Sequence, residues 1–348
     1  MTTNDNQMVN RILGELNRKI TAQIHQNAEI VDSFVSALRA QLMNSHGTLL
    51  SKANIMHSGS AYETLSVKVK TDFDIVLVLP TPYQVENFKV ERDPSHFLRL
   101  IMNPNSTAKS YLDAAKLQSQ LFEELHMCLK RVSVPGVRSV SGKKGLAAYT
   151  VEIITTSGTK ISVDLGPQIA ARAWGEYLRP LKELSAKLQD YVKMLERNAS
   201  PIYLLIAAVP GNHPNQNFLF SISFSMLEKE FLRSNPNIRD MVRLVRLVGE
   251  VRGWPKKYGL KSFCIKRLAL KFSDDLQNKL VWDGYRILLE RLFNELKCNS
   301  VIGGYFIPEP PAYKKKPEMI QELCNEIREV YHLNSSQVYM EVKEYIGC

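Results

Sequence analysis

The sequence predicts a bilobal α+β fold with a long N-terminal spine helix, a mixed-sheet lobe and a C-terminal helical lobe. Apolar residues recur at helical spacing from Val9 to Leu42 with no proline, and Gly14 is the only weak position. This pattern is typical of one long helix or of two nearly continuous helices. Strand patterns then gather between residues 66 and 165, and helical spacing dominates after residue 170. This order favours a sheet lobe followed by a helical lobe.

The strand-rich region starts with a turn predicted at residues 57–60. A short strand is predicted over 66–70 and a second over 74–79, which Pro80 ends. Helical spacing follows over 108–131. Residues 149–154 and 160–165 flank a polar turn that contains Gly158, which predicts a β-hairpin.

Helical patterns fill the second half of the chain. Prolines and a Pro-Gly pair cluster between residues 195 and 217, so we place the boundary there: 1–200 form the spine helix and sheet lobe, and 201–348 form the helical lobe. The predicted helices cover 182–197, 225–234, 238–252, 260–272, 281–297 and 317–331.

The composition excludes several classes of protein. At 348 residues, 45% hydrophobic and 23% charged, the chain has ordinary globular composition and enough length for two lobes. No apolar run approaches a membrane span, and the polar N-terminus has no apolar signal region. Five scattered cysteines lack Cys-x-x-Cys or finger-like spacing to histidine, so we expect reduced thiols, no zinc and a cytoplasmic protein.

The positive charge is concentrated in one segment. The net charge is +10, and residues 231–271 hold eleven Lys or Arg against Asp240 and Glu250 only. A charged run is often a solvated face, but one so one-sided favours a polyanionic partner.

A Gly-Ser pair and an Asp-x-Asp pair stand close together near the start of the sheet region. Gly59 and Ser60 precede Asp72 and Asp74 by about a dozen residues, and an apolar run follows. Gly59 would let the backbone approach a phosphate, and Ser60 offers a hydroxyl and an N–H group. The two carboxylates lie two residues apart and so share one face of a strand. The alternative is a polar turn followed by a buried strand that acids cap.

A third carboxylate lies on the second arm of the predicted hairpin. Ser162 and Asp164 alternate with apolar residues and share one face, so this strand could sit beside the first pair, although Asp164 could instead cap its strand end. Three carboxylates from two strands suit two Mg²⁺ or Mn²⁺ ions, which complete their shells with substrate phosphates. The chemistry implied is nucleotidyl transfer, in which the protein mainly positions and neutralises charge.

At this point the sequence resembles a known family. Gly-Ser-x-Tyr-Glu followed by Asp-Phe-Asp resembles the nucleotidyltransferase core of cyclic GMP-AMP synthase and the cGAS-like receptors, the Mab-domain family. Four further segments agree in order, and together they span residues 59–309. They are Ile161-Ser162-Val163-Asp164, residues 221–230 with Ser-Phe-Ser and Glu-Lys-Glu, Lys261-Ser262-Phe263-Cys264-Ile265-Lys266 and Gly304-Tyr305-Phe306-Ile307-Pro308-Glu309.

The resemblance implies a role for each matching residue. It makes Asp72, Asp74 and Asp164 the ligands of two Mg²⁺ or Mn²⁺ ions, and it places the triphosphate at Ser60. The nucleotide-binding set is Gly59, Ser60, Arg246, Ser262 and Lys266 for the phosphates, Phe263 for stacking on a base, and Ser225 and Glu228 for nucleotide edges.

These nucleotide-binding residues have simpler alternatives as well. Phe263 could be a core residue, Glu228 an ordinary helix acid, and Ser60 and Ser262 turn or cap residues. Arg246 could instead hold nucleic acid or face solvent, and Lys266 could belong to the outer basic face.

The chain departs from cyclic GMP-AMP synthase in four ways. Asp72 replaces a Glu, Phe263 replaces a Tyr, and Ser221 replaces an Arg that touches nucleotide, which leaves base choice and linkage open. Between Glu230 and Arg239 there is no zinc-ribbon insertion. That absence resembles the insect receptors and the oligoadenylate synthases, which answer to double-stranded RNA.

Duplex RNA is read by shape through its phosphates and 2′-hydroxyls, which a basic stripe suits. By helical spacing, the arginines at 239, 243 and 246 share a face, although some of them must turn to the active site. The predicted RNA-binding residues are Arg18, Lys19, Lys52, Arg239, Arg243, Lys256 and Lys257.

The resemblance therefore implies a sensor that joins ATP and GTP into cyclic GMP-AMP for antiviral signalling when double-stranded RNA binds, with oligomerisation on RNA possible and no membrane partner. Two alternatives stay open. One is a synthase of linear oligoadenylates, and the other is a catalytically silent Mab-domain module that binds nucleic acid or a partner.

Overall fold

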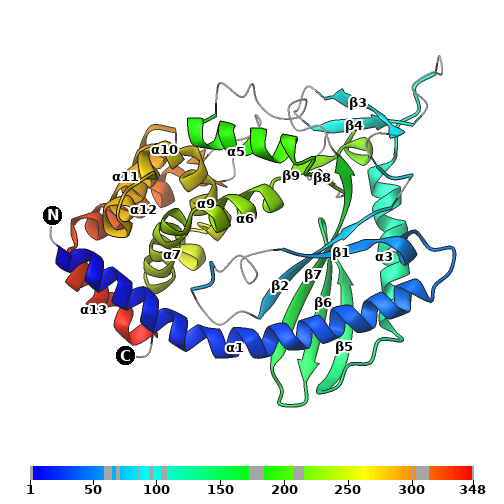
Figure 1. Ribbon diagram of the computed structural model, residues 1–348, viewed down its shortest axis with the longest axis horizontal. Helices are drawn as coiled ribbons and strands as arrows, with labels where there is room; N and C mark the ends of the chain where they lie inside the picture. The colour runs from blue at the N-terminus through cyan, green and yellow to red at the C-terminus, as the bar shows by residue number, and fades with distance from the viewer. Residues whose placement is uncertain are drawn as a thin grey trace.

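A computed structural model places a sheet lobe and a helical lobe along one spine helix (Figure 1). It describes residues 3–58, 65–67, 71–80, 82–84, 87–93, 97–102, 108–171, 184–206, 215–299, 301–302 and 313–346. Helix α1 (Thr3–Met43) contacts α3 (Ala114–Leu129) beside the sheet, and α11 (Val281–Asn299) and α13 (Ser335–Ile346) among the helices. The spine helix thus joins both lobes.

In the part of the chain that the structure describes, the main sheet has seven strands and is mixed. Its central path runs β1-β2-β7-β6-β5, while β8 pairs with β7, and β9 pairs with β8. The pairing of β2 with β7 is parallel, and the other pairings are antiparallel. The strands are β1 (Asn54–Ser58), β2 (Asp72–Val78), β5 (Val137–Lys144), β6 (Tyr149–Thr155), β7 (Lys160–Ala171), β8 (Ile202–Leu205) and β9 (Ser221–Ser223).

Smaller elements complete the described chain. Two short antiparallel pairs lie outside the main sheet, β3 (Lys89–Arg92) with β4 (Leu98–Ile101) and β10 (Val301–Ile302) with β11 (Tyr313–Lys314). The remaining helices are η1 (Leu49–Lys52), α5 (Ala186–Arg197), η4 (Gln216–Phe218), α6 (Ser225–Ser234), α7 (Pro236–Val251), α8 (Trp254–Lys257), α9 (Ser262–Lys271), α10 (Ser273–Leu276) and α12 (Pro317–His332).

Local sequence explains where several helices begin. The Asp113 side chain accepts a hydrogen bond from the backbone N–H of Lys116 and so caps α3, and Ser185 caps α5 in the same way through Leu188. Pro236 opens α7, where its missing N–H costs no helical hydrogen bond. α5 and α7 begin within a few residues of their predicted starts, whereas α3 begins six residues after the predicted start at residue 108.

The core of the helical lobe forms around α7. This helix contacts α6, α8, α9, α11 and α13, and its apolar residues are almost fully buried. Gly284 of α11 lies so close to Met241 of α7 that a Cβ there would meet the Met241 sulfur at 2.2 Å. Since α7 also lines the cavity described below, the packing of this lobe fixes one wall of that cavity.

Most of the predicted elements are confirmed, and two expectations are wrong. The spine helix, the hairpin and the six C-terminal helices are present within a few residues of the predicted bounds. Ser66 and Val67 are not in a strand, and residues 68–70 lie outside the described residues. His57 and Ser58, expected in a turn, end strand β1, because this short segment pairs with β2. The predicted boundary at residue 200 stays a prediction.

In the described part of the chain, no helix is both long enough and apolar enough to cross a bilayer.

We predict that Phe34→Ala destabilises the protein by about 3–5 kcal/mol, because Phe34 of α1 is 0% exposed and its loss leaves a cavity. Met43→Ala in the same helix, at a side chain that is 58% exposed, should change stability by less than about 0.5 kcal/mol. Urea unfolding followed by circular dichroism measures both. Equal effects of the two changes would contradict the packing role of α1.

Candidate active site

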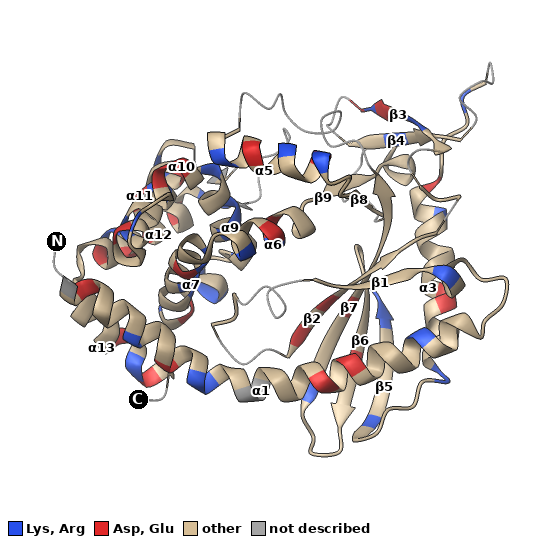
Figure 2. Cartoon of the chain, viewed as in Figure 1, with Lys and Arg blue, Asp and Glu red and all other residues tan. Residues whose placement is uncertain are grey.

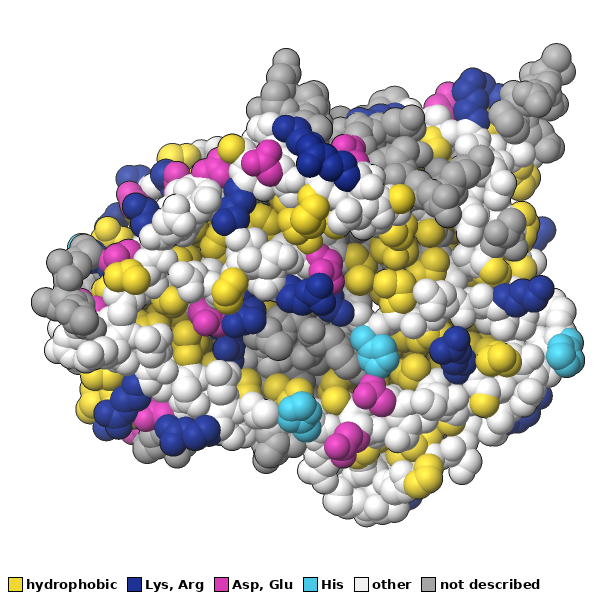
Figure 3. All heavy atoms as spheres, viewed as in Figure 1, with side chains coloured by type: hydrophobic (Ala, Val, Ile, Leu, Met, Phe, Trp, Pro, Cys, Tyr) yellow, Lys and Arg dark blue, Asp and Glu magenta, His cyan; other side chains and the backbone are white. Residues whose placement is uncertain are grey.

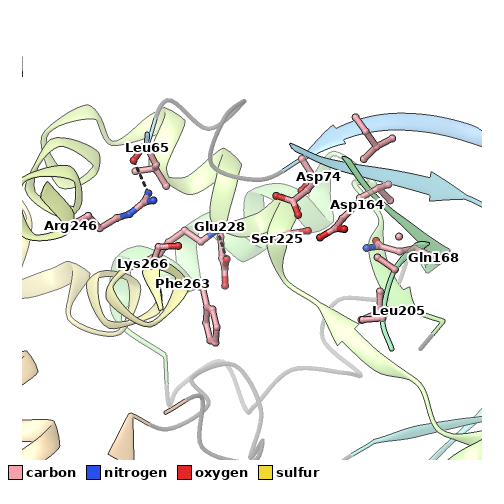
Figure 4. A pocket seen from close by; sticks show the side chains of 17 residues that line it. Leu65, Asp74, Asp164, Gln168, Leu205, Ser225, Glu228, Arg246, Phe263 and Lys266 are labelled. Atoms are coloured by element: carbon pink, nitrogen blue, oxygen red, sulfur yellow. Dashed lines mark hydrogen bonds and ion pairs between the residues drawn. The ribbon is translucent and has the colours of Figure 1, made fainter. Parts of the chain in front are cut away.

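A cavity of about 460 Å³ opens between the sheet and the helices. Figure 3 shows hydrophobic, basic and acidic side chains around the hollow at the centre of this face. In the close-up, carboxylates from the sheet face a group of side chains from α6, α7 and α9 (Figure 4). The predicted site residues that line it are Asp74, Asp164, Ser225, Glu228, Arg246, Ser262, Phe263 and Lys266.

The parallel register of β2 and β7 brings the sheet carboxylates together. Asp74 pairs with Asp164, and two residues earlier in each strand Asp72 pairs with Ser162. Paired residues point to the same side of a sheet, so all three carboxylates share the cavity face, while Phe73 is buried on the other face. Thr150 of β6 donates a hydrogen bond to Asp164 Oδ1 at 2.6 Å, which fixes the orientation of that carboxylate.

The donor set fits a hard divalent cation in part. Carboxylate oxygens are the ligands that Mg²⁺ and Mn²⁺ prefer, and Asp74 and Asp164 both line the cavity. No group of three or more His, Cys, Asp or Glu side chains with metal-binding geometry is found among the described residues. Asp72 is exposed and does not line the cavity. The described arrangement is therefore a pair of carboxylates with a third on the same sheet face beside them.

Glu228 of α6 forms a buried charged cluster with α9 on the opposite wall. It is 4% exposed, Lys266 Nζ lies 2.8 Å from its Oε2, and Arg267 Nε lies 3.4 Å from its Oε1. A buried carboxylate is costly unless it is paired, so these two cations compensate it. Lys266 also lines the cavity, but Arg267 does not.

Arg246 of α7 connects the cavity to the end of a segment outside the described residues. Its guanidinium Nη1 donates a hydrogen bond to the Leu65 carbonyl at 2.6 Å (Figure 4). Gly59 and Ser60 lie outside the described residues, as does segment 304–309. The predicted phosphate-binding turn is therefore not placed, but Leu65, a few residues after it, lines the cavity.

Helix α9 presents its first turn to the cavity. Ser262 is its first residue and Phe263 its second, and the Arg267 guanidinium lies 5.5 Å from the centre of the Phe263 ring. Cys264, which follows, is buried, and burial raises the pKa of its thiol to about 11. That thiol is protonated at neutral pH, so Cys264 is a packing residue.

Several residues that line or support the cavity were not predicted from the sequence, and two of them make side-chain hydrogen bonds to other residues of the sheet. Gln168 of β7 lines the cavity and donates a hydrogen bond to Ser223 Oγ at 3.4 Å, and Thr150 orients Asp164. The alternation that exposed Asp164 continues to Gly166 and Gln168 and could have indicated Gln168. Thr150 could be found only once the register of β6 on β7 was known.

The predicted RNA-binding residues lie in different settings. Lys19 Nζ donates to the Tyr345 carbonyl and lies over the Tyr345 ring, and Arg18 and Lys52 are exposed. Arg239 lies beside Asp240, Lys257 Nζ lies 3.2 Å from a carboxylate oxygen of Glu326, and Lys256 is exposed.

Arg243 does not belong to an open basic stripe. It is 5% exposed, and its Nη2 donates to Asn17 Oδ1 of α1 at 2.6 Å. Burial lowers the pKa of Arg243, although nearby Asp240 acts in the opposite direction. The expected single face of α7 is thus divided among the cavity at Arg246, the α1 contact at Arg243 and a partly exposed site at Arg239. Figure 2 marks Lys and Arg positions in blue along the ribbons of α7 and α9.

Comparison with known proteins agrees with this geometry. Residues 61–234 match the Mab-21 protein nucleotidyltransferase domain. The chain is also 21% identical over 276 residues to a cyclic GMP-AMP synthase-like receptor from Microplitis demolitor. That alignment covers 70% of this chain and 49% of the relative, so the chain spans about half the length of that protein. The domain match covers half of the chain, and the predicted resemblance is confirmed: the chain belongs to the Mab-21 nucleotidyltransferase family.

Proposed function

We propose that the protein is a metal-dependent nucleotidyltransferase that joins ATP and GTP into cyclic GMP-AMP when double-stranded RNA binds, as a signal in antiviral immunity. The observation that carries this proposal is the parallel pairing of Asp74 with Asp164 in a cavity that Lys266 and Phe263 also line. The name of the relative, a cyclic GMP-AMP synthase-like receptor, supports the product.

The reaction would run twice to close the ring. Each time, a ribose hydroxyl oxygen attacks the α-phosphorus of the donor triphosphate, the bond from that phosphorus to the bridging oxygen breaks, and pyrophosphate leaves with the electron pair. The hydroxyl proton would pass to solvent, because Asp164 Oδ1 already accepts from Thr150 and Oδ2 is the oxygen left to hold a metal ion. Two Mg²⁺ or Mn²⁺ ions, held by Asp72, Asp74 and Asp164, would neutralise the attacking and leaving oxygens.

The helical wall would bind the donor nucleotide. Lys266, Ser262 and Arg246, with Gly59 and Ser60, would hold the triphosphate, and Phe263 would stack on a base. Ser225 and Glu228 would contact nucleotide edges. In the structure Lys266 is paired with Glu228, so triphosphate would compete with this carboxylate for the ammonium group. Such competition makes nucleotide binding depend on the Glu228 cluster.

An activator on α7 could act on the cavity through consecutive residues. A second hollow of about 320 Å³ lies between α1 and α7 and is lined by Arg239, Arg243 and Ser66. Leu65, the preceding residue, lines the catalytic cavity and accepts from Arg246. Duplex RNA bound at Arg239 would therefore change the conformation of the segment that leads from Gly59 to the carboxylates. The inactive and the active protein would differ in the conformation of that segment.

A catalytically silent binding module is the second candidate. It is favoured by one observation, that three carboxylates do not form a metal-binding group among the described residues. An enzyme would need Asp74 and Asp164 for its function, whereas a binding module would not.

We predict that Asp74→Asn or Asp164→Asn lowers product formation by about 10³-fold, because each removes a charge that stabilises the reaction. Purified protein is incubated with ATP, GTP, Mg²⁺ or Mn²⁺ and duplex RNA, and products are separated and weighed by mass spectrometry. RNA affinity should not change in either variant. The proposal is overturned if the wild-type protein makes no dinucleotide under any of these conditions. If the products are linear oligoadenylates, the protein is a transferase whose product is linear and not cyclic.

Lys266→Ala and Arg267→Ala form a matched pair, because both cations contact Glu228 but only Lys266 lines the cavity. We expect Lys266→Ala to raise the KM for the donor nucleotide about tenfold, the loss of one charge-assisted hydrogen bond. Arg267→Ala should raise it much less. Steady-state kinetics measure the KM of each variant, and thermal melts serve as a folding control. Equal KM values for the two variants would contradict the assignment of Lys266 to the phosphate site.

Lys256→Ala and Lys257→Ala test the RNA surface. Both lysines are exposed, but Glu326 pairs with the Lys257 ammonium, so Lys256→Ala should weaken RNA binding more. Fluorescence anisotropy at several salt concentrations should show a slope of log K against log salt smaller by about 1 for Lys256→Ala. An unchanged slope would place the RNA elsewhere.

A further inference from the structure

One row of side chains crosses the sheet from the catalytic pair to its edge strand. Asp74 pairs with Asp164, Asp164 pairs with Thr150, and Thr150 pairs with Lys143 of β5. Directly paired residues project from the same face of a sheet. Lys143 therefore projects from the cavity face, in the row that holds both carboxylates.

The neighbouring lysine shows that the two faces are distinct. Lys144 pairs with Tyr149 in the register, and Tyr149 is buried against Phe122 of α3. The Lys144 ammonium forms an ion pair with Glu123 of α3, and its hydrogen bond holds the pKa of Glu123 below the ordinary value. Lys144 thus serves the α3 face, and Lys143, one residue earlier, serves the opposite face.

The turn between β5 and β6 is held at the rim of the cavity. The Gly145 N–H donates to the Ala148 carbonyl at 3.0 Å, and Gln118 of α3 donates from Nε2 to the Leu146 carbonyl at 2.8 Å. Gln118 is itself buried. Ala147 and Ala148 line the cavity, so this turn forms part of its wall. Lys143 precedes the turn by two residues and is not itself a lining residue.

Lys143 is exposed, and it has no ion pair with any residue in the part of the chain that the structure describes. Two strand spacings, about 10 Å, separate its Cα from that of Asp164. A lysine side chain spans only part of that distance, and Thr150 occupies Asp164 Oδ1. The ammonium group is thus placed to meet an anion bound beside Asp164 rather than the carboxylate itself.

We propose that Lys143 binds a phosphate group of the acceptor nucleotide. This rests on the proposed transferase function. The donor triphosphate is assigned to Lys266 and Ser262 on the helical wall, which faces the carboxylates of β2 and β7 (Figure 4). In the sheet order, β5 lies two strands beyond β7, on the side away from β2. The acceptor, whose hydroxyl must approach Asp164 from the other side, then brings its own 5′-phosphates toward β5. Lys143 is a point charge that suits them.

Acceptors with and without phosphates test this assignment. Wild type, Lys143→Ala and Lys144→Ala are compared with ATP as donor and either GTP or guanosine as acceptor, and with GTP as donor and either ATP or adenosine. Lys143→Ala should raise the KM for the triphosphate acceptor about tenfold and leave the nucleoside acceptor unchanged, since only the former loses a charge-assisted contact. Lys144→Ala should change neither. Lys143→Arg should restore most of the affinity.

A binding measurement separates this inference from the proposed function. Calorimetric titration with GTP and with guanosine needs no turnover, and Lys143→Ala should weaken GTP binding alone. If the wild-type protein binds GTP but makes no product, the transferase proposal fails while the role of Lys143 is still measured. Equal losses for GTP and guanosine, or equal effects of Lys143→Ala and Lys144→Ala, would overturn the inference.

Discussion

β2 and β7 pair as parallel strands from Asp72 opposite Ser162 to Val78 opposite Gln168, and the chemistry of the cavity depends on that register. A shift of one residue would turn Asp164 into the core and Val163 into the cavity, since side chains alternate between faces. The apolar residues Phe73, Ile75, Val163 and Leu165 are almost fully buried on the opposite face, so a shifted register would expose them. The same hydrophobic burial that forms the lobe therefore aligns the carboxylates.

The helical wall is held by a different kind of constraint. Glu228 is a buried acid whose two oxygens face Lys266 and Arg267, and leaving either cation without it would cost several kcal/mol. This cluster joins α6 to α9 and so fixes the turn that carries Phe263. Under the proposed function, the carboxylate with which a triphosphate would compete for Lys266 thus also holds the wall together, which would link nucleotide affinity to the stability of α9.

The sequence was sufficient to predict elements that have a strong pattern of apolar residues. It was insufficient where the structure depends on a contact with a distant part of the chain. Alternation in 160–165 predicted the strand and the shared face of Ser162 and Asp164, and α1 was readable from its apolar spacing. β5 was not predicted, because an exposed edge strand reading Val-Arg-Ser-Val-Ser-Gly-Lys-Lys has no apolar face to read. The burial of Arg243 depends on Asn17, 226 residues away, and helical spacing within α7 carries no trace of that contact.

The surface formed by the basic segment, residues 231–271, is less positive than its sequence suggests. Acids from distant parts of the chain meet its cations: Arg252 pairs with Glu341 and Glu329, Lys257 with Glu326, and Lys271 with Glu295. Glu326 also accepts from Trp254 and Tyr258, and although burial opposes this, these bonds hold its pKa below the ordinary value. The attraction of this surface for a polyanion would therefore be set by the few exposed cations, such as Lys256 and Lys261. If duplex RNA binds as proposed, the few exposed cations would give only a modest salt dependence of the affinity, and recognition would depend mainly on how the surface near α7 and α8 fits the shape of the duplex.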